Sequence, residues 1–274
     1  MTSSKSGARE EQHSYVSPYV LDNAGPEAAT RFPALAATFD ADTIRRLEQL
    51  GVADGSRCLE VGGGGGSIAA WLASRVGAAG RVLVTDLDTR FLESLHLPNT
   101  DVQRHDIATD PLPSDAFDVV HARLVLSHVR ERDRALARMA AAVKTGGWIL
   151  IEDFDATMVP DPALHSAEVL STTYVAVTRL MADRGVDRRY GRRLFGCLRA
   201  LGLQSIAAEG RTFMWQAGSP GPLLMRANFE QLRDDLVDGG YVTASEFERD
   251  VAALEDPEFV MPSPILWAAW GRRQ

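Results

Sequence analysis

Residues 58–66 read Cys-Leu-Glu-Val-Gly-Gly-Gly-Gly-Gly, a short apolar run that holds one acid, Glu60, and ends in five consecutive glycines. Glycine loses more backbone freedom on folding than any other residue, so a row of five is costly to order. A protein tolerates this cost where the chain turns sharply and a ligand contacts the backbone. A helical pattern follows over residues 67–76. The order of strand, tight turn and helix N-terminus therefore predicts a nucleotide-binding turn.

The segments around this turn alternate between strand-like and helix-like patterns. Strands are predicted at residues 57–61, 81–85, 102–105, 117–122 and 148–154, and helices at 68–76, 89–96 and 130–143. Strands separated by helices indicate βαβ units and a mostly parallel sheet. We therefore expect an α/β, Rossmann-like fold with helices on both faces of the sheet.

The pattern changes after residue 155, where helical segments dominate. Helices are expected at 162–184, 190–201, 222–238 and 243–254, strands within 204–216, and a closing strand at 265–270. A minimal sheet does not need so many helices, so we expect an additional helical cover formed by insertions at about 160–186 and 219–256. Residues 22–53 are predicted to be largely helical. Residues 1–20 are interpreted as a flexible segment and a candidate lid, followed by one domain over 21–274.

Composition excludes several classes of partner. The chain has 274 residues and a formal net charge of −8, which argues against a broad phosphate-binding surface and hence against a nucleic-acid partner. Because no apolar stretch is long enough to span a bilayer and the N-terminus lacks a signal region, we expect a cytoplasmic protein without a membrane partner. Cys58 and Cys197 lack metal-ligand spacing, and no metal is predicted. A homo-oligomer is left open.

Acidic residues follow the predicted strands at the edge where ligands bind in an open parallel sheet. Asp86 ends the second strand and can accept two hydrogen bonds from a ribose diol; the alternative is that it caps the next helix. Asp106 follows the third strand and can accept from the exocyclic amine of adenine; the alternative is a turn residue. Glu60 is expected beside a helix N-terminus, where its charge favours a sulfonium or amine ligand over a dinucleotide.

Taken in order, these segments resemble class I S-adenosylmethionine-dependent methyltransferases. Residues 59–66 resemble the acidic-x-Gly-x-Gly-x-Gly motif of that family, and Asp86 resembles its ribose-binding acid. Residues 105–107 are similar to its adenine-binding segment. Residues 118–123 resemble its fourth strand, and 144–153 resemble the turn and fifth strand.

The resemblance covers about residues 40–155, and Thr145 replaces a common proline. It implies a seven-stranded sheet whose last strand, 265–270, is antiparallel. It also implies S-adenosyl-L-methionine as the cofactor, with the methionine moiety over residues 62–64. The cofactor-binding residues that we assign on this basis are Glu60, Gly62, Gly64, Gly66, Asp86, Leu87, Asp106, Ile107 and Arg123.

Two residues are candidates for catalysis. Methyl transfer from a sulfonium mainly requires that the acceptor is positioned and water is excluded, and a general base only if the acceptor must lose a proton. His128 follows the fourth strand and is the candidate base; a histidine that bonds backbone at a helix start is the alternative. Tyr19 is a candidate to shield the sulfonium by a cation–π contact; the alternative is an anchor for the N-terminal segment.

The function predicted from these residues is methyl transfer to O, N or C of a small organic molecule. The helical cover favours an enclosed pocket, and the Arg- and Ala-rich composition resembles actinobacterial proteins of specialised metabolism. Two other functions stay open. One is an NAD(P)-dependent oxidoreductase, and the other is a non-catalytic or cyclase-type protein that binds S-adenosylmethionine.

Overall fold

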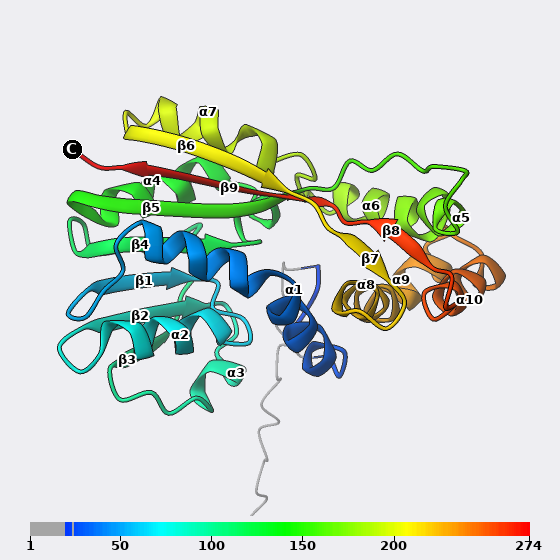
Figure 1. Cartoon of the computed structure of the whole chain (residues 1–274), viewed down its shortest axis with the longest axis horizontal. Helices are drawn as coiled ribbons and strands as arrows, with labels where there is room; N and C mark the ends of the chain where they lie inside the picture. The colour runs from blue at the N-terminus through cyan, green and yellow to red at the C-terminus, as the bar shows by residue number, and fades with distance from the viewer. Residues whose placement is uncertain (1–19, 24) are drawn as a thin grey trace, which may run out of the picture.

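The computed structural model describes residues 20–23 and 25–274, and a seven-stranded sheet forms its centre (Figure 1). The strand order is β3-β2-β1-β4-β5-β9-β6. The strands are β1 Arg57–Val61, β2 Arg81–Asp86, β3 Thr100–Arg104, β4 Phe117–Arg123, β5 Val143–Asp155, β6 Gln204–Arg211 and β9 Ile265–Arg272. β9 pairs antiparallel with both of its neighbours, β5 and β6, whereas β1 to β5 pair in parallel. The predicted fold class and the antiparallel closing strand are therefore confirmed.

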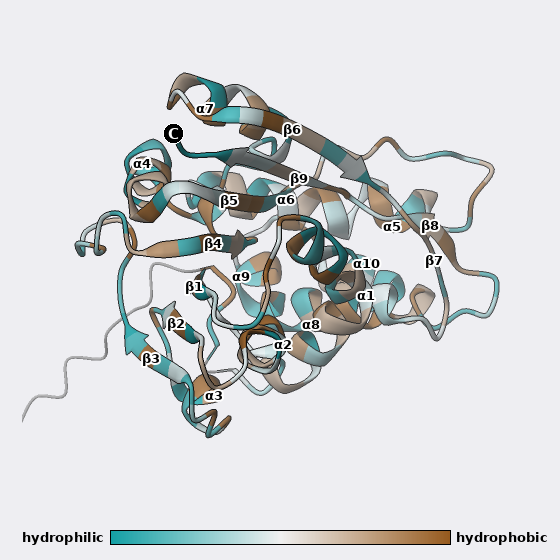
Figure 2. Cartoon of the chain, turned by 60° about the vertical axis from the view of Figure 1, so that its left-hand side comes forward, coloured by the Kyte–Doolittle hydropathy of each residue, from teal (hydrophilic) through white to brown (hydrophobic). Residues whose placement is uncertain are grey.

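Helices cover both faces of the sheet. One face carries α1 Ala28–Gln49, α2 Ser67–Val76 and α3 Arg90–Glu93, and the other carries α4 Arg132–Ala142 and α7 Leu194–Ala200. Because side chains alternate along a strand, Cys58 packs against the first group of helices and Leu59 against the second. Figure 2 shows the matching amphipathic pattern on α4, whose Leu136 and Met139 are buried. The alternation of side chains along β1, β4 and β5 thus determines which of them face α1.

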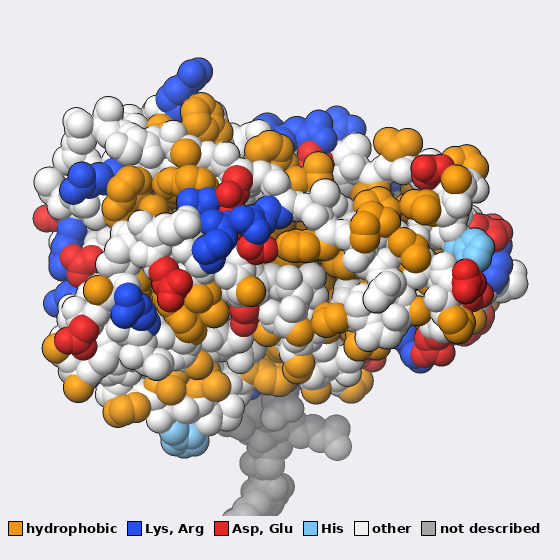
Figure 3. Space-filling view, in the orientation of Figure 1, with side chains coloured by type: hydrophobic (Ala, Val, Ile, Leu, Met, Phe, Trp, Pro, Cys, Tyr) orange, Lys and Arg blue, Asp and Glu red, His pale blue; other side chains and the backbone are white. Residues whose placement is uncertain are grey.

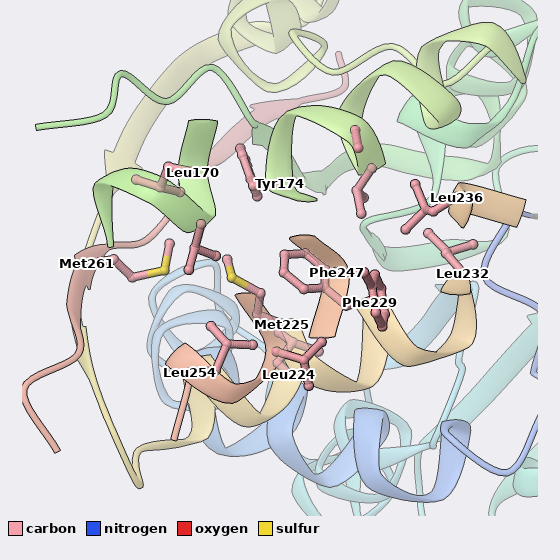
Figure 4. Packing of buried hydrophobic residues seen from close by; sticks show 14 of the residues in the cluster. Leu170, Tyr174, Leu224, Met225, Phe229, Leu232, Leu236, Phe247, Leu254 and Met261 are labelled. Atoms are coloured by element: carbon pink, nitrogen blue, oxygen red, sulfur yellow. The ribbon is translucent and has the colours of Figure 1, made fainter. Parts of the chain in front are cut away.

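The remaining helices form a second layer beyond the carboxyl ends of the strands. We call this part the helical cover: α5 Ala167–Ser171, α6 Thr173–Asp183, α8 Pro220–Gln231, α9 Arg233–Asp238, α10 Ala244–Ala253 and the paired strands β7 Met214–Gln216 and β8 Val260–Pro262. It has its own apolar core, in which Tyr174, Met225, Phe229 and Phe247 converge (Figure 4). The first half of α1 lies between the sheet and this cover and packs on α8 (Figure 1).

Several elements differ from the sequence prediction. The single helix expected at 162–184 is two helices, which are interrupted at Thr172. The hydroxyl of Thr172 donates to the carbonyl of Glu168 at 2.8 Å and also contacts Asp250 of α10, so a tertiary contact ends α5. The helix expected at 89–96 has only four residues, and β8 was not predicted. No helix among the described residues has the length and apolar character needed to cross a membrane.

The 3₁₀ turns complete the fold. They are η1 Leu126–His128, directly after β4, and η2 Gly191–Arg193, before α7. Asp153 at the end of β5 holds η1, because its carboxylate accepts a hydrogen bond from the Ser127 amide at 2.8 Å. Burial raises the pKa of Asp153 to about 6. The segment that follows β4 is therefore tied to β5 by a buried carboxylate.

Candidate active site

The glycine turn joins β1 to α2 in the conformation that the sequence predicts. Gly62, Gly64 and Gly66 have φ angles of +73°, +53° and +80°, which residues other than glycine rarely adopt. The amide of Gly62 donates to the carbonyl of Thr85 at 2.7 Å, so the turn is fastened to β2. A Cβ atom on Gly62 would lie 2.2 Å from Cγ2 of Val125. This position therefore requires glycine for both conformation and space.

Asp86 lies against the same turn. Its Oδ2 accepts a hydrogen bond from the Gly64 amide at 2.8 Å, and its Oδ1 accepts from the Asp88 amide at 3.0 Å. Burial raises the pKa of this carboxyl above its usual range, although the amide hydrogen bonds oppose the change. Leu87, the next residue, is half-buried. The acid of the second strand and the glycine turn thus form one unit at the carboxyl edge of the sheet.

Asp106 and Ile107 follow β3 on the same edge. Oδ1 of Asp106 accepts from the Ala108 amide at 2.8 Å, and the Asp106 amide donates to Oδ2 of Asp110 at 2.9 Å. These are the contacts of a turn residue, the alternative stated above. Ile107 is buried. The assignment of both residues to adenine stays a prediction.

Glu60 has a partner that the sequence did not predict. Its carboxylate was expected beside the N-terminus of α2, but Oε2 lies 2.6 Å from Nδ1 of His121 on β4. Nε2 of the same imidazole lies 3.1 Å from Oε2 of Glu152 on β5, and all three side chains are buried. Burial lowers the pKa of His121, but the two carboxylates outweigh it and raise that pKa to about 9. His121 is therefore an imidazolium held between two carboxylates.

The polar contacts continue from β5 to α1. The hydroxyl of Thr43 donates to Glu152 at 2.6 Å, and Arg123 donates to Thr43 at 2.9 Å and to Asp40 at 2.7 Å. We call the connected side chains of Glu60, His121, Glu152, Thr43, Arg123 and Asp40 the α1 network. Arg123 was assigned to the cofactor, but the structure places its guanidinium on α1. This difference arises because Arg123 shares the strand face of His121, which α1 covers.

Helix α1 also reaches the glycine turn itself. A Cβ atom on Gly65 would lie 2.6 Å from Cβ of Phe32, so the Phe32 side chain rests on the turn. Its ring packs edge-on against Phe91, with centroids 5.1 Å apart. At its other end, α1 is fixed to β6 by ion pairs of Arg45 and Arg46 with Glu209. Figure 3 shows basic and acidic side chains side by side near the centre of the face in view. Sequence reasoning gave α1 no role in the site.

The two candidate catalytic residues differ in what the structure shows. His128 is half-buried at the end of η1. Burial, together with the positive charges of Arg31 and Arg132, lowers the pKa of His128 to about 4. Its imidazole is therefore neutral at physiological pH and a weak base, and its catalytic role stays a prediction. Tyr19 lies outside the described residues.

Comparisons with known proteins find similarities for the central segment of the chain. Residues 59–151 match the family described as methyltransferase domain. The chain is 31% identical over 123 residues to the ubiquinone/menaquinone biosynthesis C-methyltransferase UbiE of Laribacter hongkongensis, covering 42% of this chain and 49% of the relative. It is 32% identical over 142 residues to methyltransferase str2 of Strobilurus tenacellus, covering 50% of each chain. The chain thus spans about half the length of the curated relatives it matches.

Solved structures share the fold over most of the chain. Phosphoethanolamine N-methyltransferase 2 of Haemonchus contortus, solved with S-adenosyl-L-methionine, matches with a TM-score of 0.55 at 17% identity, covering 85% of this chain and 53% of that chain. The YcgJ protein of Bacillus subtilis matches with a TM-score of 0.53 at 14% identity, covering 84% of this chain and 97% of that chain. Together with the family match, these similarities confirm the predicted resemblance to class I S-adenosylmethionine-dependent methyltransferases.

Proposed function

We propose that this chain, whose residues 59–151 match the methyltransferase domain family, transfers a methyl group from S-adenosyl-L-methionine to O, N or C of a small organic molecule. The observation that carries the proposal is the hydrogen bond between the Gly64 amide and the Asp86 carboxylate. It unites the glycine turn and the acid of β2 at the carboxyl edge of the sheet, where nucleotides bind in open α/β folds. A carboxylate in this place is suited to the two hydroxyls of a ribose.

The residues at the turn fit a sulfonium donor. The left-handed glycines allow the turn to bend sharply, and Val125 and Phe32 pack where side chains on Gly62 and Gly64 would lie. The α1 network contributes three carboxylates, one imidazolium and one guanidinium, which leaves one excess negative charge beside the turn. An excess negative charge favours a cationic sulfonium or ammonium group and disfavours a pyrophosphate. The charge balance therefore supports methyl transfer over an NAD(P)-dependent reaction.

When bound, S-adenosylmethionine supplies a methyl group already activated by its sulfonium. The chain then has to hold the donor, position the acceptor and exclude water. We assign the first task to Glu60, Gly62, Gly64, Gly66, Asp86, Leu87, Asp106 and Ile107. The helical cover is suited to the other two tasks, because it stands beyond the carboxyl ends of the strands (Figure 1).

On the acceptor side we propose a role for His128 as a hydrogen-bond acceptor. A neutral imidazole whose pKa is about 4 orients a hydroxyl or amine more effectively than it removes a proton near pH 7. We keep carbon among the acceptor atoms, which the similarity to a C-methyltransferase supports. We further propose that the enzyme is cytoplasmic, and that its acceptor is a specialised metabolite.

Two measurements test the proposal. Calorimetric titration should show binding of S-adenosylmethionine and S-adenosylhomocysteine and no comparable binding of NADH. Incubation with labelled S-adenosylmethionine and a panel of phenols, amines and indoles should give a methylated product. Failure to bind either form of the cofactor at millimolar concentration would refute the proposal. Binding without methylation of any acceptor would favour a non-catalytic or cyclase-type protein.

A further inference from the structure

Arg31 is a buried charge on the part of α1 that lies between the sheet and the helical cover (Figure 1). Arg31 is only 3% exposed to solvent. The guanidinium donates to the carbonyl of Leu21 at 2.9 Å, to Oε1 of Gln231 at 2.7 Å and to Oδ1 of Asn23 at 2.6 Å. All three acceptors are neutral. Over residues 20–23 and 25–274, Arg31 has no ion pair with a carboxylate.

An arrangement of this kind is unusual on energetic grounds. Arginine does not lose its proton in proteins, so burial cannot be relieved by neutralising the side chain. A buried charge is normally paired, because the cost of removing it from water is otherwise several kcal/mol. The nearby charge does not compensate: Arg31 and Arg132 both act as positive charges on His128 and lower its pKa. The local field around Arg31 therefore favours an anion.

The position of Arg31 suits a contact with the acceptor substrate better than a structural contact with the sheet. Phe32, the next residue, rests on the glycine turn, and His128 follows β4 at the same edge. On the opposite side, Gln231 belongs to α8 of the helical cover. Asn228, one turn earlier on α8, has a buried side-chain oxygen with no hydrogen-bond partner among the described residues. Where α1 packs on α8, a buried guanidinium and an unsatisfied amide oxygen are therefore both present.

We propose that the acceptor substrate carries a carboxylate, and that Arg31 binds this group. The inference rests on the proposed methyl transfer and narrows its substrate class to organic acids that also carry an N–H or O–H donor. The guanidinium has five N–H donors in a planar fork that matches a carboxylate, and three are used by the neutral oxygens described above. A bound carboxylate neutralises the buried charge and leaves the methyl-accepting atom to be oriented by the cover.

The experiment uses the full chain loaded with S-adenosylhomocysteine and pairs of probes that differ only in charge. These are 4-hydroxybenzoate with 4-hydroxybenzamide, and indole-3-acetate with indole-3-acetamide. Calorimetric titration should show that at least one acid binds about tenfold or more tightly than its amide, as expected for a charge-assisted bidentate pair. The R31Q variant should lose this preference, whereas R31K should retain part of it. The R45Q variant, which removes an arginine elsewhere on α1, should keep it.

Three outcomes would overturn the proposal. Acids and amides that bind equally to the wild type, in every pair, would show that no carboxylate is recognised. A loss of S-adenosylhomocysteine affinity in R31Q, with unchanged affinity for 5′-methylthioadenosine, would assign the guanidinium to the amino-acid end of the donor. A double variant E10Q/E11Q with the same loss of preference as R31Q would identify a carboxylate of the chain itself, outside the described residues. The absence of any S-adenosylhomocysteine binding would instead refute the proposed function.

Discussion

His121 offers the sharpest test of the electrostatics at the sheet edge. Its imidazole lies between Glu60 and Glu152, with all three side chains buried. The two carboxylates raise the pKa of His121 from its ordinary value of 6.5 to about 9. The folded protein therefore binds this proton more tightly than the unfolded chain does. Between these two pH values the unfolded state loses the proton and the folded state keeps it.

The sign and size of the effect follow from this difference. A raised pKa stabilises the fold fully below the unfolded value of 6.5, and the contribution is lost as the pH rises through about 9. At 1.36 kcal/mol per pKa unit, the contribution that disappears over this range is about 3 kcal/mol. Glu152 behaves in the opposite sense, because contact with His121 holds its pKa below the usual range. Its contribution is present at neutral pH and is lost only under acidic conditions.

The assay is urea unfolding of wild type and H121Q between pH 6 and pH 10. We expect the stability difference between the two proteins to shrink by about 3 kcal/mol across this range, because the variant has no imidazole to titrate. Tyrosine and cysteine groups titrate in both proteins and cancel in the comparison. A variant of the exposed His165, H165Q, should follow the wild-type curve. A constant difference between wild type and H121Q would refute the buried imidazolium.

Three further predictions concern the glycine turn and His128. The D86A variant should bind S-adenosylhomocysteine more weakly by about 1–3 kcal/mol in calorimetry, and unchanged affinity would remove Asp86 from the site. The G62A variant should lose about 1–3 kcal/mol of stability in urea, because its Cβ meets Val125, whereas G196A, which meets no atom within 4 Å, should be neutral or more stable; equal effects would contradict the turn geometry. The H128A variant should turn over more slowly while the pH–rate profile keeps its shape between pH 5.5 and 8, since the pKa of His128 is about 4; loss of an inflection near pH 6.5 would contradict this.

The sheet could be predicted from the sequence because its signals are local. β1 has the predicted bounds, and β4 ends only one residue beyond the expected position. The glycine turn is equally local, since five glycines between a strand and a helix leave few alternatives. The contact between Gly64 and Asp86 could also be predicted from the sequence, because adjacent parallel strands end at the same edge of the sheet.

The partners of Glu60 and Arg123 could not be predicted in the same way. Both side chains lie on the face of the sheet that α1 covers. Which helix covers a strand depends on tertiary packing, and the local sequence pattern of the strand does not contain this information. The interruption at Thr172 has the same origin, because it depends on Asp250, which is 78 residues away in the sequence. The sequence of α1 does contain a sign of buried polar contacts. Positions 31, 35, 39, 43 and 47 follow one another at intervals of four along α1, and Arg31 and Thr43 interrupt an otherwise apolar row.

The polar face of the sheet has a consequence for how donor and acceptor sites are connected. A hydrophobic layer at Glu60, His121 and Glu152 would in general be as stable as a buried ion network or more so, so the network is better explained by its charge than by stability. Its excess negative charge lies beside the turn that would hold a sulfonium. The helix that completes the network through Asp40 and Thr43 also carries Phe32 onto the turn and Arg31 toward the cover. Helix α1 therefore connects the glycine turn, which is suited to a cation, with Arg31, which is suited to an anion. A cationic donor would offset the excess negative charge of the α1 network, and an acidic acceptor would offset the positive charge of Arg31.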